Sequence, residues 1–291
     1  YTDMKADAKV LALAYDGEFC DVVSVDEDAK EDVLVVLDRT PFYAESGGQV
    51  ADTGVIKTET ATLKVLDCRK TGKGFYVHTC TLENGFVKAG DMAVAAVDED
   101  TRKATMRNHT SAHLLQAALR MVLGNHVHQS GSYVDSERCR FDFTHFSAMT
   151  AEELAEVENL VNDAIAEAMD VTTREMSMDD AKKSGAMALF GEKYGDTVRV
   201  VSMGEFSKEL CGGTHVNNTG VISVFKILSE SGIAAGVRRI EAITAEGVFD
   251  YYKKQADVCG NLLQIHNNEE IPSLYRKWLI DAVNFIIKEK K

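Results

Sequence analysis

The sequence lacks the features that mark membrane-spanning, secreted and disulfide-stabilised proteins. No apolar run approaches the roughly 18 residues that a membrane-spanning helix needs. Residues 1–7 lack the basic and apolar regions of a signal peptide. The six cysteines are scattered without paired spacing, which favours reduced thiols over a disulfide framework. We therefore expect a cytoplasmic protein with no membrane partner.

Positive charge is also scarce. The chain has 32 Lys and Arg residues against 46 Asp and Glu residues, a formal net charge of −14. This balance argues against non-specific attraction to a phosphate backbone, so any nucleic-acid contact must use local basic groups. Arg107, Arg238 and Arg239 are the candidates for such contacts. The 291 residues suffice for one large domain or two ordinary ones.

The first hundred or so residues have the pattern of short β-strands. Val33–Leu37 is a short apolar run, and residues 92–97 form a second candidate strand. Residues 63–66 and 75–78 flank the glycine turn at 71–74, as the two strands of a hairpin do. Short strands at this spacing predict a small β-barrel.

The rest of the chain predicts helices packed on a mostly antiparallel sheet, which is an α+β arrangement. A helix that begins near Asp100 carries His109 and His113 on its polar side, away from its apolar stripe. A second helix begins at Thr150, where Glu153 completes a capping box. The other expected elements are a helix over 179–189, strands over 198–203, 221–228 and 237–243, and a helical tail from about residue 247.

Two pairs of potential metal ligands stand out, His109 with His113 and Cys211 with His215, each with its members four residues apart. Residues four apart on a helix share one face, so the two histidines can reach one metal ion. Three imidazoles and one thiolate suit a tetrahedral Zn²⁺. Either pair alone is weak evidence, since a solvated helix face is the more common explanation. Together they predict one zinc ion per chain.

The residues around these two pairs limit the reactions that the predicted zinc site could support. No glutamate follows His109, so the metalloprotease motif with its built-in base is missing and a zinc peptidase is disfavoured. Gly212 and Gly213 let the backbone come close to a ligand or present its amides. Cys139 and His128 are the possible replacements if one of the four ligands is wrong.

A second cluster at 40–49 combines a proline, two aromatic residues and two adjacent glycines, which predicts a tight exposed turn. On composition alone an ordinary barrel loop explains it. In the functional interpretation, the amide of Gln49 donates to and accepts from a polar substrate. A third cluster, at 190–196, is bounded by glycines and taken alone is a loop.

Together these segments resemble the editing region of the alanyl-tRNA synthetases (alanine–tRNA ligases) and of the freestanding alanyl-tRNA editing proteins. The resemblance implies a translation-factor-like β-barrel, then the α+β editing core shared with threonyl-tRNA synthetase, then a helical tail. We place these three domains at 1–99, 100–246 and 247–291. The matching segments, in the family's order, are 38–49, 108–115, 190–201, 209–216 and 229–241.

The resemblance implies a deacylase that removes wrongly attached serine or glycine from the acceptor end of tRNA for alanine. It also implies Zn²⁺ at the two ligand pairs. In the family, ATP serves a separate aminoacylation domain; no segment here resembles the class II synthetase motifs, so we expect no aminoacylation from this chain. The start at Tyr1 and the long tail favour a fragment over a freestanding editing protein.

Chemistry leaves the role of the zinc ion open. Zinc could activate water or polarise the ester, or it could bind the amino group of the substrate and order the pocket. Gln49 is the candidate for orienting the substrate, and the amides of Gly212 and Gly213 are candidates for holding the ester oxygen. No carboxylate lies inside either ligand motif, so no general base is assigned. The expected substrate and tRNA contacts are Ser46, Gly47, Gly48, Thr214, Arg107, Arg238 and Arg239.

Two alternatives remain open at this point. A tRNA-docking module with a purely structural zinc ion would bind tRNA without turnover. The tail either packs on its own domain or self-associates through apolar residues at helical spacing, which are Leu274, Trp278, Leu279, Ala282 and Phe285.

Overall fold

The computed structural model describes residues 3–24, 32–187 and 195–267. The chain forms two compact units, Tyr1–Thr244 and Ala245–Lys291. The first unit holds the barrel and the α+β part that carries the predicted ligands. None of the helices in these ranges is both long enough and apolar enough to cross a membrane.

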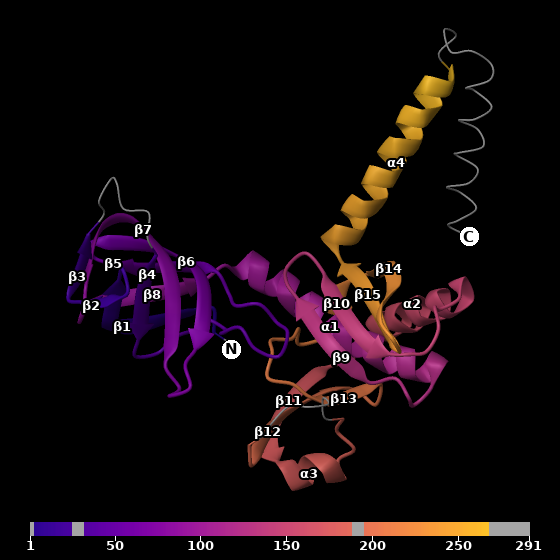
Figure 1. Ribbon diagram of the computed structural model, residues 1–291, viewed down its shortest axis with the longest axis horizontal. Helices are drawn as coiled ribbons and strands as arrows, with labels where there is room; N and C mark the ends of the chain where they lie inside the picture. Colours follow the sequence, from indigo (N-terminus) through magenta and orange to yellow (C-terminus); the bar gives the residue numbers. More distant parts are fainter. Residues whose placement is uncertain (1–2, 25–31, 188–194, 268–291) are drawn as a thin grey trace. The chain divides into compact units, whose positions relative to one another are not determined.

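Six described N-terminal strands close into a barrel, which is drawn in indigo to purple in Figure 1. The eight strands of this region are β1 (Lys5–Tyr15), β2 (Glu18–Cys20), β3 (Val22–Ser24), β4 (Val33–Leu37), β5 (Gly54–Thr58), β6 (Ala61–Lys70), β7 (Tyr76–Lys88) and β8 (Met92–Val97). Antiparallel pairing runs through β1, β4, β7, β6, β5 and β8 and returns to β1. Alternate side chains such as Val10, Val35 and Leu63 point inward and are completely buried. The predicted small barrel is therefore confirmed.

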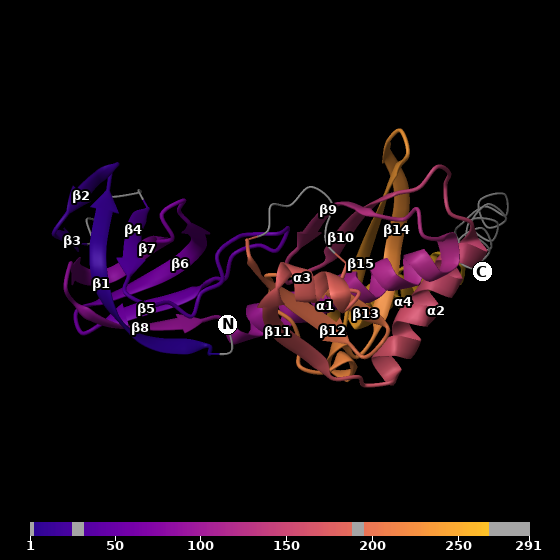
Figure 2. The same ribbon diagram turned by 90° about the horizontal axis from the view of Figure 1, so that it is seen from below.

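The second part of this unit packs two helices against an antiparallel sheet in the order β14, β15, β10, β9 (Figure 2). Side chains from both helices and from the sheet form one apolar core, which includes Leu115, Val157 and Phe141. The elements are α1 (Glu99–Leu123), β9 (Gln129–Val134), β10 (Cys139–Thr144), α2 (Ala151–Ala166), β14 (Phe225–Ala234) and β15 (Val237–Thr244). These layers confirm the expected α+β arrangement.

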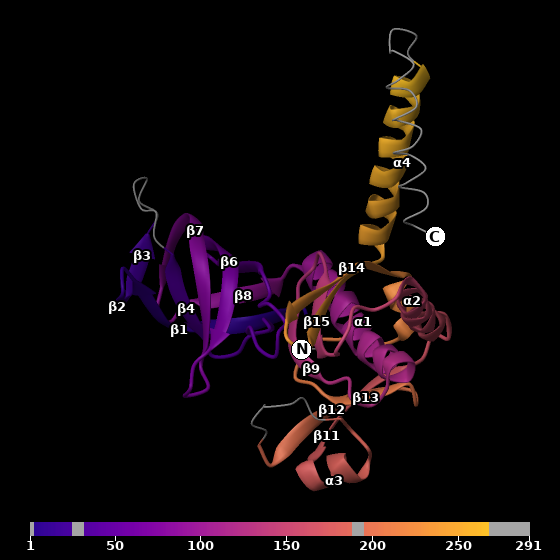
Figure 3. The same cartoon turned by 45° about the vertical axis from the view of Figure 1, so that its right-hand side comes forward.

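A small three-stranded sheet carries the chain toward the second ligand pair (Figure 3). It consists of β11 (Val171–Ser177), β12 (Thr197–Met203) and β13 (Ser207–Leu210), with α3 (Met178–Lys183) between the first two strands. Because β13 ends at Leu210, Cys211 is the first residue beyond the strand. The pairing of β12 with β13 therefore fixes where this cysteine lies.

Two elements predicted from the sequence in this part have the wrong boundaries. The helix expected over 179–189 ends at Lys183, because Gly185 adopts a left-handed conformation (φ +78°) that stops the helix; the last two residues of that range lie outside the described chain. The strand expected over 221–228 is replaced at its start by a 3₁₀ turn, Thr219–Ile222. Ser223 (φ +71°) follows this turn, so β14 begins only at Phe225.

The predicted capping box at the start of α2 is confirmed. The Thr150 side chain accepts from the Glu153 amide, and the Glu153 carboxylate accepts from the Thr150 amide. The second unit begins with α4, Glu246–Asn267. The apolar tail positions and the cluster at 190–194 lie outside the described residues.

A buried ion pair fastens the loop before β5 to the first turns of α1. Arg102 is fully buried, and its Nε donates to Asp52 Oδ1 at 2.6 Å while a second nitrogen donates to Oδ2. The same carboxylate accepts from the Tyr43 amide at 2.6 Å, and Arg102 also donates to the Pro41 carbonyl at 3.0 Å. The loop that carries Gln49 is thus held on α1 through one carboxylate.

We predict that Arg102→Met destabilises the protein by about 3–5 kcal/mol, because it leaves the Asp52 carboxylate buried without its partner. Urea unfolding, followed by far-ultraviolet circular dichroism, measures the change. Arg69→Met is the matched control: Arg69 pairs with Glu45 and Asp67 in exposed positions, where solvent can replace it. Equal unfolding midpoints for the two variants would contradict the role given to the buried pair.

Candidate active site

Helix α1 delivers the first ligand pair into the interior of the protein. Asp98 caps the helix by accepting from the Thr101 amide at 3.0 Å, and Gly124 (φ +110°) ends it. His109 and His113 are only 5% and 6% exposed. The polar side of α1 is therefore not a solvated helix face, because protein groups from the barrel loop and from β13 cover it.

The second pair follows β13, and Gly213 lies between its two members. Arg199 donates to the Cys211 carbonyl at 3.1 Å and to the Gly213 carbonyl, and the Cys211 amide donates to the Arg199 carbonyl at 3.0 Å. A β-carbon on Gly213 would overlap the ring of His109 and come within 2.8 Å of Gln49 Oε1. The glycine therefore lets the backbone approach the first pair closely.

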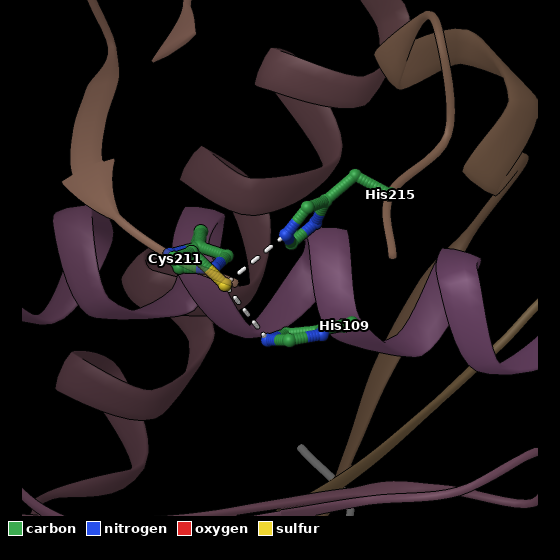
Figure 4. Close-up of side chains that lie close together, drawn as sticks. His109, Cys211 and His215 are labelled. Atoms are coloured by element: carbon green, nitrogen blue, oxygen red, sulfur yellow. Dashed lines mark hydrogen bonds between the residues drawn. The ribbon is translucent and has the colours of Figure 1, made fainter. Parts of the chain in front are cut away.

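The structure brings all four predicted ligands together. One potential ligand atom from each of His109, His113, Cys211 and His215 lies within 4.8 Å of the others. The Cys211 sulfur lies 3.5 Å from His109 Nε2 and 3.2 Å from His215 Nε2. Figure 4 shows the sulfur between these two rings, with dashed lines to both. The possible replacements named above, Cys139 and His128, are not part of this group.

Each imidazole is oriented by a partner on its outer nitrogen. His109 Nδ1 lies 2.7 Å from Gln49 Oε1, and His113 Nδ1 lies 2.6 Å from Glu209 Oε2. An amide oxygen and a carboxylate can only accept, so both rings carry their proton on Nδ1. Their Nε2 atoms then keep a lone pair that faces the centre of the group.

His215 follows the same pattern through a hydroxyl. Its Nδ1 lies 3.2 Å from Thr110 Oγ1, and that hydroxyl already donates to the Met106 carbonyl at 2.8 Å. The hydroxyl oxygen is therefore left to accept from His215 Nδ1, and Nε2 again faces inward. In all three histidines Nδ1 thus faces a protein acceptor, which leaves Nε2 for the centre of the group.

The charges around Cys211 favour its thiolate, which is the form that binds a metal ion. Burial raises the pKa of the Cys211 thiol, but the three surrounding imidazoles outweigh it and lower this pKa well below its usual value. Burial lowers the pKa of His215 to about 3, so this ring is neutral. Burial also lowers the pKa of His113, but the Glu209 carboxylate and the Cys211 thiolate raise it well above its usual value. A metal ion that binds here therefore competes with the proton of His113.

These four residues fit a bound zinc ion. Within the described ranges, His113 Nε2 is buried without a hydrogen-bond partner, which is expected of a nitrogen that awaits a metal. A set of three imidazoles and one thiolate suits tetrahedral Zn²⁺, whereas Mg²⁺ and Ca²⁺ require oxygen ligands. An outer acceptor on each ring is the usual support of such a site.

The ligand group opens onto a cavity of about 520 Å³. His109 and His113 form part of its wall, and Ser46 and Gly47 of the barrel loop form another part. Gly212 and Gly213 line it as well, next to the ligands. Lining residues not anticipated from the sequence include Lys70, Gln116, Gln129, Ser132 and Arg199.

The barrel loop reaches the site by pairing with β9. The Val134 amide donates to the Gly48 carbonyl at 2.8 Å, and the Val50 amide donates to the Val134 carbonyl at 3.0 Å. A β-carbon on Gly48 (φ +84°) would lie 2.5 Å from the Ser132 carbonyl oxygen, so the close pairing depends on glycine. Gly47 (φ +58°) precedes it in the same tight turn, which carries the chain to Gln49.

Gln49 is fully buried, and its amide is bonded to protein groups. Besides His109, its oxygen accepts from the Thr214 amide at 2.8 Å, and its nitrogen donates to the Thr214 hydroxyl at 2.9 Å. Thr214 lines a second cavity of about 770 Å³ together with His215. Gln49 thus connects the barrel loop, α1 and the second ligand pair in one hydrogen-bond network.

The three candidate basic contacts are not among the described residues that line the first cavity. Arg239 makes two hydrogen bonds to Asp142, at 2.6 and 2.7 Å. Arg238 pairs instead with Glu230 on the neighbouring strand. Arg107 has a buried Nε and also has a partner in the protein.

Glu209 is the functional residue that the sequence analysis missed although a signal was present. It lies two residues before Cys211, in β13, and alternate side chains of a strand share a face. A carboxylate in that position can reach the same centre as the cysteine. No comparable signal marked Gln116, whose role depends on the cavity around it.

Comparison with known proteins matches both parts of the first unit. Residues 1–101 match the family of class II (A) tRNA synthetases. This match falls on the barrel and the start of α1. Residues 198–241 match the second additional domain of threonyl and alanyl tRNA synthetases. The latter range contains Cys211 and His215.

Several alanine–tRNA ligases are similar to nearly the whole chain. The protein of Acetivibrio thermocellus is 51% identical over 277 residues, which are 95% of this chain and 31% of that protein. Alanine–tRNA ligase 1 of Lachnoclostridium phytofermentans is 56% identical over 93% of this chain and 31% of its own length. The protein of Thermoanaerobacter sp. is 44% identical over 100% of this chain and 32% of its own length. The chain, which spans about a third of these relatives, belongs to the alanine–tRNA ligase family.

Proposed function

We propose that this chain is the proofreading part of an alanine–tRNA ligase and hydrolyses the ester that joins serine or glycine to tRNA for alanine. The observation that carries the proposal is a buried group of three imidazoles and one thiolate that opens onto a cavity lined by two glycines. The matched second additional domain and the names of the relatives support the same substrate class. The tRNA partner and the absence of aminoacylation by this chain belong to the proposal.

The roles of the three domains are also part of the proposal. The barrel of 1–99 supplies the loop that reaches the cavity, 100–246 is the deacylase domain, and 247–291 is a helical linker that could self-associate. One zinc ion per chain would be held by the two ligand pairs. A cytoplasmic location agrees with the five described cysteines, all of which are free thiols.

A bound zinc ion would supply Lewis acidity toward the ester or toward water. The protein groups around it have separate tasks. Glu209 and Gln49 hold the imidazoles of His113 and His109 with their Nε2 atoms inward, and Gln49 acts as a positioning residue. The amide of Gly212 is the better candidate for holding the ester oxygen, because the Gly213 amide is directed at the Cys211 sulfur at 3.4 Å.

The remaining predicted contacts divide by their position. Ser46 and Gly47 line the cavity and are proposed to contact the terminal nucleotide or the amino acid, whereas Gly48 and Thr214 support the loop and Gln49. Arg107, Arg238 and Arg239 are proposed as contacts for tRNA phosphates farther from the ester. Their positive charge is partly neutralised by neighbours such as Asp142, so their contribution is expected to be small.

We predict that Cys211→Ala abolishes hydrolysis of seryl-tRNA for alanine, lowering the rate by more than about a hundredfold, and reduces zinc content well below one per chain. Release of labelled serine and metal analysis on the same sample measure both quantities. Cys20→Ala, which removes a half-buried thiol in the barrel, is the control and should change neither. Full activity of Cys211→Ala would exclude the proposed function. Tight tRNA binding by the unmodified chain without turnover would indicate a docking module instead.

We predict that Glu209→Gln weakens zinc binding by about 10–100-fold, since the neutral amide no longer holds the Nδ1–H of His113 with a charge-assisted bond. Competition with a coloured chelator gives the affinity. Glu205→Gln, four residues earlier and exposed, is the control. Unchanged zinc affinity in Glu209→Gln would show that the carboxylate does not support the site.

A further inference from the structure

Gln116 lies on the wall of the cavity, one helical turn beyond the second histidine of the first ligand pair. His109, Ala112, His113 and Gln116 all line this cavity. Their spacing places them on one face of α1, so the cavity runs along that helix. Gln116 is 2% exposed, which makes its amide one of the most buried polar groups around the cavity.

Only one half of this amide is bonded to the protein. Gln116 Nε2 donates to the Met187 sulfur at 2.8 Å. Gln116 Oε1 is buried and, within the described part of the chain, has no hydrogen-bond partner. A thioether sulfur accepts weakly and cannot donate, so it selects the NH₂ group and turns the carbonyl away from itself. A buried carbonyl without a partner is costly and calls for a donor from elsewhere.

We propose that Gln116 Oε1 accepts a hydrogen bond from the side-chain hydroxyl of the serine to be removed, and thereby selects serine over amino acids of the same size that lack a donor. The inference rests on the proposed hydrolysis and adds the group that recognises the amino acid. No residue of the two ligand pairs can take this role, because their nitrogen and sulfur atoms face one another.

The distances along α1 suit this assignment. Residues three apart on a helix, such as His113 and Gln116, have Cβ atoms about 5–6 Å apart. A hydrogen bond between two oxygens occupies about 2.7–2.8 Å of that span. The remainder is roughly 3 Å, and the three covalent bonds of about 1.5 Å each that join the carbonyl carbon of a serine to its hydroxyl oxygen can fold to that length. A serine held at the ligand group can therefore reach Gln116.

The chemistry explains a selection that size alone cannot achieve. A small cavity admits glycine, alanine, serine and 2-aminobutyrate with little discrimination, because one methylene or hydroxyl changes binding only modestly. A buried acceptor discriminates more strongly, because an amino acid without a hydroxyl leaves it unpaired. Glycine would still be hydrolysed, but without any contribution from Gln116.

The test compares two substrates and two proteins. The substrates are tRNA for alanine charged with serine and with 2-aminobutyrate, which replaces the hydroxyl by a methyl group of similar size. The proteins are the unchanged chain and Gln116→Met, which keeps the side-chain length but removes the acceptor. We expect kcat/KM for serine to exceed that for 2-aminobutyrate by about tenfold in the unchanged chain and by less than about twofold in Gln116→Met.

The controls separate recognition from damage to the site. Glycyl-tRNA hydrolysis should fall far less than seryl-tRNA hydrolysis in Gln116→Met, and its zinc content should match that of the unchanged chain. Lys103→Met places the same substitution on an exposed position of α1 and should leave the ratio of the two substrates unaltered.

Three results would overturn the inference. If Gln116→Met keeps the tenfold preference, another group recognises the hydroxyl. If the unchanged chain hydrolyses both substrates equally fast, no hydroxyl is recognised, and this comparison needs no folded variant. If it hydrolyses neither substrate nor glycyl-tRNA, the proposed function itself fails and the inference fails with it.

Discussion

The site depends on keeping three imidazoles and one thiol together in the protein interior. Buried polar groups are tolerated only when they are bonded, so each ring needs an acceptor on its outer nitrogen. The barrel loop supplies Gln49, β13 supplies Glu209 and α1 supplies Thr110. The fold around the site is organised to bring these three acceptors to one place.

This constraint explains why the barrel is part of the site. Gln49 reaches His109 because its loop pairs with β9 on one side and is held by the Asp52–Arg102 ion pair on the other. Two glycines make the approach possible: Gly48 lies against Ser132, and Gly213 lies against His109. A side chain at either position would separate elements that the hydrogen bonds hold together. The barrel thus positions part of the hydrogen-bond network at the candidate site as well as forming a domain.

The sequence predicted those features that depend on local pattern. Short apolar runs predicted β4 and β8 at their observed boundaries, and Thr150 with Glu153 predicted the capped start of α2. The four ligands could be named because each pair is close in the chain. The sequence could not show that the two pairs meet, because their meeting depends on how β13 pairs with β12 and how α1 packs beside these strands.

Features that depend on tertiary contacts could not be predicted from the sequence. The polar side of α1 resembles a solvated face in sequence, yet it is buried because other elements supply partners for its polar groups. Gln116 gives no local signal, since its proposed role rests on a carbonyl that has no hydrogen-bond partner among the described residues. Glu209 is the intermediate case: strand alternation places it on the same side as Cys211, but only the structure shows which ring it holds.

The most direct measurement is the zinc X-ray absorption spectrum of the purified chain loaded with one equivalent of zinc. The arrangement of the four side chains predicts a first shell of three nitrogens at about 2.0–2.1 Å and one sulfur at about 2.3 Å. Imidazole scattering should be evident beyond that shell. A first shell without sulfur, or with two or more sulfurs, would contradict the claim that His109, His113, Cys211 and His215 together hold the ion.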